Sequence, residues 1–196
     1  MKVPFVDLKA QYKSIKPAID KAIGSVIEES AFIKGKYVRD FEESFARLYG
    51  IKNVVSCANG TESLYIIMKM LGIESGDEVI TSANSWISSS ETITQTGAKP
   101  VFADVHPEYY SMDESLLEEK ITTKTRAVIA VHLQGQMCEI RKIKSICDKH
   151  KIHLIEDCAQ SHFSEYQGVR AGLTGIASSF SFYPGKNLGA YEMPAA

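Results

Sequence analysis

The sequence predicts an α/β fold in three layers, α/β/α, with a mostly parallel sheet covered by helices on both faces. Two observations support this prediction. From about residue 52, short runs rich in valine and isoleucine alternate with longer segments whose apolar residues recur at helical spacing. The short runs are apolar at nearly every position, which is typical of parallel strands that are buried on both sides.

Length and composition narrow the functional classes. The 196 residues suit one domain or a piece of a larger protein, and 44% hydrophobic with 23% charged residues is ordinary for a globular chain. The net charge is −2 and no basic block occurs, so we expect no nucleic-acid partner. No apolar run has the length of a membrane span, and the N-terminus lacks a secretory signal, so we expect no membrane association and a cytoplasmic location with reduced cysteines.

The first 50 residues predict two helices. Residues 11–30 have apolar positions near helical spacing, as in an amphipathic surface helix. A second helix is expected at 38–48, with Phe41, Phe45 and Leu48 on one face. Neither segment carries residues that point to chemistry, so their aromatic residues are interpreted as packing groups.

The remaining elements are expected in alternation. The predicted strands are 53–57, 78–82, 99–105, 126–133, 153–157 and 176–182. The predicted helices are 62–71, 86–96, 113–121 and 138–150. Either Asp113 or Ser111 is expected to cap the third of these helices.

Polar groups follow four of the predicted strands. Ligands of parallel sheets bind beyond the carboxyl ends of the strands, so groups at these ends converge at one rim. The four groups are Asn59-Gly60-Thr61, Asn84-Ser85-Trp86, Asp157 with Gln160, and Ser181 with Lys186. Their convergence is a stronger indication of a site than any one of them.

Each group also has an ordinary structural interpretation. Lys186 follows Pro184-Gly185 on a loop, where it is either a solvated surface lysine or, in a closed pocket, a nucleophilic amine. Gly60 and Thr61 open a helix and either bind an anion or only form the turn and its cap. Trp86, the only tryptophan, either stacks on a ligand or fills the core.

Asp157 ends an apolar strand, and a carboxylate there needs a cationic partner, a structural salt bridge being the alternative. Gln160 lies three residues further on and could reach the same ligand. Glu156, the preceding residue, should point to the other face of the sheet.

Other ligand motifs are weak or missing. The chain has no Gly-x-Gly-x-x-Gly, and Gly185-Lys186 is followed by asparagine, so neither a dinucleotide site nor a Walker A loop is favoured. A series of possible metal ligands fits no common zinc pattern, so we interpret its members as helix-end and core residues and expect no metal. The series is Cys147, His150, His153 and Cys158.

Taken together, these residues resemble the DegT/DnrJ/EryC1/StrS family of nucleotide-sugar aminotransferases, which use pyridoxal 5'-phosphate (PLP). The resemblance runs from Val3 to about Tyr191. The motifs that carry it are Asn59-Gly-Thr-Glu-Ser-Leu64, Gly76-Asp-Glu-Val-Ile80, Gly97-Ala-Lys-Pro-Val-Phe102, Val131-His-Leu-Gln-Gly-Gln136, Glu156-Asp-Cys-Ala-Gln160 and Ser181-Phe-Tyr-Pro-Gly-Lys-Asn-Leu-Gly189.

The resemblance implies a role for each group at the rim. Lys186 would form the Schiff base with the cofactor and then move the proton, and a lysine here separates aminotransferases from a related dehydrating branch that has histidine. Asp157 would pair with the protonated ring nitrogen, which keeps the ring an electron sink. Gln160 would bond the ring hydroxyl and Trp86 would stack on the ring.

The resemblance further implies that Gly60, Thr61 and Ser181 hold the cofactor phosphate. The reaction would be amino transfer, usually from L-glutamate, to a keto group of a nucleotide-linked sugar. The opening Phe5-Val-Asp-Leu-Lys-Ala-Gln-Tyr12 is similar to members that act on dTDP-linked 3-keto-6-deoxyhexoses for surface polysaccharides or related deoxyaminosugars. The full-length family implies a homodimer.

The ending departs from the family pattern. Family members continue with Gly-Asp-Ala-Gly where Tyr191 is followed here by Glu-Met-Pro-Ala-Ala. We therefore expect residues 1–196 to be an N-terminal segment plus an incomplete large domain of a fold-type I PLP-dependent transferase, without the C-terminal small domain. Such a chain would bind cofactor weakly and turn over little. The alternative is a non-catalytic protein of the same scaffold, serving as a binding or regulatory module.

Overall fold

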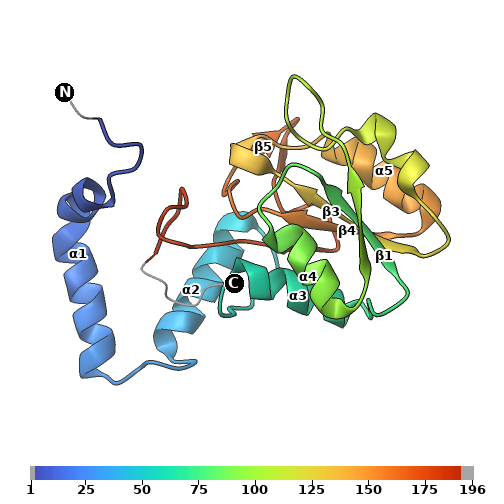
Figure 1. Ribbon diagram of the computed structural model, residues 1–196. Coiled ribbons are helices and arrows are strands. Elements are labelled where there is room, and N and C mark those ends of the chain that lie inside the picture. The colour runs from blue at the N-terminus through green and yellow to red at the C-terminus, as the bar shows by residue number, and fades with distance from the viewer. Residues whose placement is uncertain (1–2, 191–196) are drawn as a thin grey trace. The chain divides into compact units, whose positions relative to one another are not determined.

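The computed structural model describes residues 3–190, and the chain divides into two compact units, Met1–Ser56 and Cys57–Ala196 (Figure 1). The last residues of the sequence, including Tyr191 and the atypical ending, lie outside the described residues. Among the helices of the described part, none has both the length and the apolar character that crossing a membrane requires.

The first unit contains the two predicted helices, α1 (Leu8–Glu28) and α2 (Lys36–Tyr49). Asp7 caps α1 by accepting a hydrogen bond from the Ala10 amide at 2.8 Å. The residues of α1 are all at least partly exposed. The apolar residues that recur along α1 are therefore not buried within this chain.

An aromatic row runs along α2. Phe41 and Phe45 stack with ring centroids 5.7 Å apart, and Phe45 and Tyr49 stack at 4.6 Å. Leu48, which helical spacing places on the same side of α2 as Phe41 and Phe45, is 60% exposed. The row follows the i, i+4 spacing, which Leu48 does not share.

The second unit confirms the predicted α/β class. Its main sheet has the strand order β2-β1-β3-β4-β7, and all neighbouring strands are parallel. These strands are β1 (Glu78–Ser82), β2 (Lys99–Ala103), β3 (Thr125–Val131), β4 (His153–Asp157) and β7 (Ala177–Ser179). A small antiparallel hairpin, β5 (Glu165–Tyr166) with β6 (Val169–Arg170), was not predicted because two-residue strands carry no periodic pattern.

Helices cover both faces of this sheet, with α3 (Gly60–Met70) and α4 (Ser88–Thr96) on one side and α5 (Ile140–His150) on the other (Figure 1). Leu64 of α3 and Ile93 of α4 pack in one core cluster with Ile129 of β3. Alternate strand residues face opposite ways, and Val128 and Ala130 on the other face of β3 are fully buried as well. Three short 3₁₀ turns complete the unit: η1 (Glu114–Leu116), η2 (Glu118–Lys120) and η3 (Leu133–Gly135).

Two predicted elements were wrong. Residues 53–57 form no strand, because no neighbouring strand of the described chain pairs with them. Instead Val55 is 74% exposed and the Ser56 amide donates to Glu42 Oε1. The predicted helix at 113–121 is the pair of turns η1 and η2, although Asp113 does cap it by accepting from the Ser115 amide.

Candidate functional site

A cavity of about 960 Å³ lies at the carboxyl ends of the parallel strands. It collects residues from the loops after β1, β3, β4 and β7 and from the start of α3. All of the predicted site residues line it, namely Gly60, Thr61, Trp86, Asp157, Gln160, Ser181 and Lys186. The convergence inferred from the sequence is thus present in the fold.

The N-terminus of α3 presents backbone donors to this cavity. Asn59 uses its side-chain oxygen and its carbonyl to accept from the amides of Glu62 and Ser63. Within residues 3–190, the amides of Gly60 and Thr61 have no protein acceptor. Unpaired amides at the positive end of a helix dipole are suited to binding an anion.

Gly60 is required for close approach of two segments. A Cβ atom on Gly60 would lie 3.0 Å from Ser181 Cβ and 3.2 Å from the Phe180 carbonyl oxygen. The Ser179 hydroxyl donates to the Gly60 carbonyl at 3.0 Å, which joins β7 to the start of α3. The glycine therefore brings Ser181 next to the unpaired amides.

Asp157 ends β4 with a buried carboxylate. Its Oδ1 accepts from the Ala159 amide at 3.1 Å, and its Oδ2 accepts from the Ser89 hydroxyl of α4 at 3.0 Å. Burial raises the pKa of Asp157, and these two donors and the charge of Lys186 offset the rise only in part. Among the described residues no cation forms an ion pair with Asp157, so the carboxylate lacks the partner that its burial calls for.

Lys186 lies half-buried on the loop that follows β7. The Lys186 amide donates to the Tyr183 carbonyl at 2.8 Å, and the Ala190 amide donates to the Phe182 carbonyl at 2.8 Å. Burial lowers the pKa of the Lys186 amine, while the Asp157 carboxylate opposes this change. A lowered pKa increases the fraction of free amine, which is the nucleophilic form.

Gln160 and Trp86 complete the lining. Gln160 Oε1 accepts from the Gln134 amide at 2.7 Å, so its side-chain NH₂ is the group left to donate to a ligand. Trp86 is 71% exposed, so the core interpretation of this tryptophan was wrong. Trp86 lies directly before Ile87, the N-cap of α4, and it lines the cavity.

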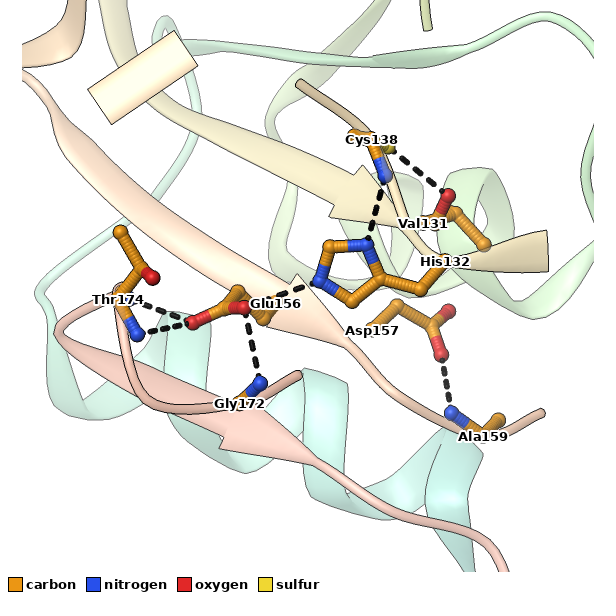
Figure 2. Close-up of polar contacts among 9 residues, drawn as sticks. Val131, His132, Cys138, Glu156, Asp157, Ala159, Gly172 and Thr174 are labelled. Carbon is orange, nitrogen blue, oxygen red and sulfur yellow. Dashed lines mark hydrogen bonds and ion pairs between the residues drawn. The ribbon is translucent and has the colours of Figure 1, made fainter. Parts of the chain in front are cut away.

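Glu156 points to the opposite face from Asp157, as predicted, and Figure 2 shows its surroundings. Its Oε1 accepts from the amides of Thr174 and Gly175, and its Oε2 accepts from the Gly172 amide and His132 Nε2, all within 2.9 Å. Burial acts to raise the pKa of Glu156, but these donors outweigh it and hold the pKa below its usual value.

His132 is fully buried beside Glu156 (Figure 2). The Cys138 amide donates to His132 Nδ1 at 3.2 Å, which places the ring proton on Nε2, the nitrogen that faces Glu156 at 2.9 Å. Ligand atoms of His132, Glu156 and Cys158 lie within 4.8 Å of one another. Because the nitrogen and oxygen atoms already have protein partners, this cluster is a structural network.

The metal-like series of the sequence does not converge on one point. His150 Nε2 lies 2.7 Å from Glu118 Oε1, and Cys147 is buried in α5. His153 begins β4 whereas Cys158 follows its other end. These positions agree with the interpretation as helix-end and core residues.

Several residues of the site were not predicted. Ser89 holds Asp157, the Ser88 hydroxyl lies 2.7 Å from that of Thr61, and Gln134 fixes Gln160. The run of serines directly after Trp86 was the available signal for the first two. Gln134 carries an unusual positive φ of 56°, which the sequence does not reveal.

The comparison with protein families decides the identification. Residues 13–192 match the DegT/DnrJ/EryC1/StrS aminotransferase family. This chain belongs to that family. The resemblance inferred from the sequence motifs is thereby confirmed.

Two relatives illustrate the range of the family. The chain is 41% identical over 189 residues to UDP-2-acetamido-2-deoxy-3-oxo-D-glucuronate aminotransferase of Pseudomonas aeruginosa, with 96% of this chain and 53% of the relative covered. It is 40% identical over 191 residues to a pleiotropic regulatory protein of Geobacillus stearothermophilus, with 97% and 51% covered. The chain thus spans about half the length of the curated relatives it matches.

Solved structures agree with this assignment. DesV of S. venezuelae, determined in complex with a ketimine intermediate, superimposes with a TM-score of 0.93 at 37% identity, covering 97% of this chain and 51% of that one. NtdA of Bacillus subtilis, determined with the bound cofactor PMP, gives a TM-score of 0.88 at 28% identity, with 96% and 42% covered. The described fold thus matches about half of the first of these chains and somewhat less than half of the second.

Proposed function

We propose that this chain supplies the cofactor-binding part of a PLP-dependent aminotransferase that transfers an amino group to a keto group of a nucleotide-linked sugar. The observation that carries the proposal is the cavity that brings together Lys186, the unpaired Asp157 carboxylate and the free amides at the start of α3. Membership in the aminotransferase family and the name of the Pseudomonas relative support it.

The residues present fit PLP group by group. Its phosphate is an anion, which suits the amides of Gly60 and Thr61 with the Ser181 hydroxyl nearby. Its ring nitrogen is basic, and Asp157 is a buried carboxylate without a cation among the described residues. Bound PLP supplies an electron sink for the carbon that loses its proton.

Four residues of the chain would each have a role in this reaction. Lys186 would hold the cofactor through its amine and would carry the proton at Nζ, a task that its lowered pKa favours. Asp157 keeps the ring nitrogen protonated through its negative charge. Gln160 donates to the ring hydroxyl through its free NH₂, and Trp86 shields the ring face at the cavity edge.

We further propose that the substrate is a 3-keto sugar linked to dTDP or UDP, that L-glutamate donates the amino group, and that a second copy of the chain is the partner. The Pseudomonas relative is named for a UDP-linked 3-oxo sugar, which supports the keto position. Trp86 lines the cavity and is largely exposed, so a ligand that extends past the cofactor could contact its ring.

Borohydride trapping of PLP tests the cofactor proposal. The parent chain should develop a visible absorption band with PLP, and reduction should fix the cofactor on Lys186, located by mass spectrometry of peptides. Lys186→Ala should lose both signals, while Lys124→Ala, which removes an exposed lysine, should keep them. A parent chain without the band at excess PLP, or with label spread over many lysines, would contradict the proposal.

A second candidate is a non-catalytic regulatory protein of the same scaffold, which the name of the Geobacillus relative favours. Both candidates allow PLP to bind at Lys186. Adding L-glutamate to the PLP-loaded chain separates them, because an aminotransferase converts the visible band to that of PMP. A regulatory protein leaves the band unchanged.

A further inference from the structure

The loop that carries Lys186 is closed on itself. We define the lysine loop as residues 182–190, whose two ends are joined by the hydrogen bond from the Ala190 amide to the Phe182 carbonyl. A Cβ atom at Gly189 would clash with the Pro184 carbonyl oxygen, so the two sides of the loop pack closely at this glycine. The residue next to Lys186, Asn187, connects the loop to a different segment.

Asn187 makes two hydrogen bonds to a single residue, His162. Asn187 Oδ1 lies 2.8 Å from His162 Nδ1, and Asn187 Nδ2 donates to the His162 carbonyl oxygen at 3.3 Å. His162 follows β4 by five positions and is itself held in place, being only 5% exposed. Its ring packs against Phe180 at 5.5 Å and against the edge of Phe182 at 5.0 Å between centroids.

The bonding pattern fixes the protonation of His162. Because Asn187 Nδ2 faces a carbonyl, Asn187 Oδ1 is the acceptor and His162 Nδ1 carries the proton. Burial lowers the pKa of His162 and the charge of Lys186 lowers it further, against the effect of Asn187. His162 is therefore a neutral hydrogen-bond donor near the Lys186 amine.

We propose that His162 and Asn187 form a clamp that positions Lys186 for its chemistry. This proposal rests on the function proposed for Lys186. Both polar groups of the Asn187 side chain are used by His162, so Asn187 acts through the backbone of its neighbour. Fixing one side of the loop to the buried His162 restricts the directions that the Lys186 amine can take, and an amine held in position reacts faster.

The two members of the clamp allow matched substitutions. Asn187 is exposed, so Asn187→Leu removes both bonds without touching the core. His162→Phe retains a ring against Phe180 and Phe182 but removes the Nδ1 donor. Leu188→Ala, at an exposed position of the same loop, serves as the control.

The first measurement is the rate at which PLP becomes fixed on Lys186, followed by timed borohydride quenching across pH. We expect both single variants to react about 10-fold to 100-fold more slowly. The double variant should be no slower than the slower single variant, because both changes break one interaction. The control should match the parent.

The second measurement is hydrogen exchange of the Lys186 and Ala190 amides without cofactor. Loss of the clamp should speed exchange about fivefold to tenfold in both single variants. A parent chain that does not react with PLP at Lys186 contradicts the proposed function alone, and exchange then still decides whether the loop is clamped.

Three outcomes would overturn the clamp. Unchanged capture rates in both variants, or unchanged amide exchange, would show that the bonds do not hold the loop. A double variant whose capture rate falls by the product of the two single reductions would show that the two residues act separately. Slow capture in Asn187→Leu with normal capture in His162→Phe would assign Asn187 to direct ligand contact instead.

Discussion

Two neighbouring carboxylates on β4 have opposite environments. Glu156 accepts from His132 and three backbone amides, and its pKa lies below the usual value. Asp157, one residue on and facing the other side of the sheet, has two donors and a raised pKa. The strand geometry separates a carboxylate that holds the fold from one that is open to a ligand.

The difference lies in what each carboxylate still requires. Glu156 is satisfied by the protein, since it joins β3, β4 and the loop at Gly172–Gly175 in one network. Asp157 faces a cavity that also holds Lys186, whose pKa moves the opposite way, downward. Two titratable groups whose pKa values are shifted in opposite directions within one cavity are typical of functional sites.

The largest expected effect is on folding, from Glu156→Gln. This change puts an amide NH₂ against backbone donors and removes the negative charge, so the free energy of unfolding should fall by about 3–5 kcal/mol. Urea unfolding of the cofactor-free chain measures it. Glu119→Gln, at an exposed position, should change stability by less than about 0.5 kcal/mol. A loss below about 1 kcal/mol for Glu156→Gln would mean that its network does not support the fold.

Asp157→Asn should leave the stability of the fold intact and weaken the binding of PLP. An asparagine can keep the bond from the Ala159 amide through its oxygen, and its NH₂ can donate to the Ser89 hydroxyl in place of the bond that Ser89 donated. It also removes a buried charge, so the cofactor-free chain should be as stable as the parent or more so. Its affinity for PLP should fall on the order of 100-fold because the ring nitrogen loses its counter-charge. Fluorescence titration with PLP checks this. Equal affinity for parent and variant would contradict the role of Asp157.

The two carboxylates should also give opposite pH dependence in the cofactor-free chain. The folded pKa of Glu156 is below its ordinary 4.5, so its contribution to stability is present above that pH and is lost as the pH falls. The folded pKa of Asp157 is above its ordinary 3.8, so the folded state binds the extra proton and stability falls as the pH rises through that window. The measurement is the free energy of unfolding of the parent, Glu156→Gln and Asp157→Asn between about pH 3 and 7. Each substitution should remove one contribution to the dependence of this free energy on pH. The same pH dependence in both variants would contradict the opposite pKa shifts of the two carboxylates.

The smallest expected effect comes from Ser89→Ala. It removes one of the two donors to Asp157, so the pKa of Asp157 should rise further and PLP affinity should fall about fivefold to tenfold. Ser90→Ala, whose hydroxyl donates to the Ile87 carbonyl, should leave the affinity unchanged. Equal effects of the two serine changes would show that the hydrogen bond to Asp157 is not what matters.

The buried centre of the fold was predictable from sequence, and its margins were not. Residues 78–82 and 153–157 were predicted at the observed bounds, because each has an apolar centre, Val79-Ile80 or Leu154-Ile155, that suits a strand buried on both faces. Residues 53–57 have the same apolar character but find no neighbouring strand in the described chain. Local pattern alone cannot show whether a pairing partner exists.

The candidate site shows the same division. The predicted site residues converge because each follows an element whose end is fixed by sheet topology. Ser89, which bonds Asp157, and His162, which bonds Asn187 beside Lys186, were missed, since contacts across 68 and 25 positions depend on packing that no local motif encodes. The roles assigned to the site residues remain predictions.

Nitrogen-15 NMR of the chain loaded with PLP labelled at its ring nitrogen tests the central claim most directly, that Asp157 is kept unpaired for a cationic ligand. The chemical shift of that nitrogen reports whether it carries a proton. A protonated ring nitrogen in the parent at neutral pH, lost in Asp157→Asn and retained in a Glu156→Gln chain that still folds, is the predicted result. An unprotonated nitrogen in the parent, or a protonated one in Asp157→Asn, would contradict the claim.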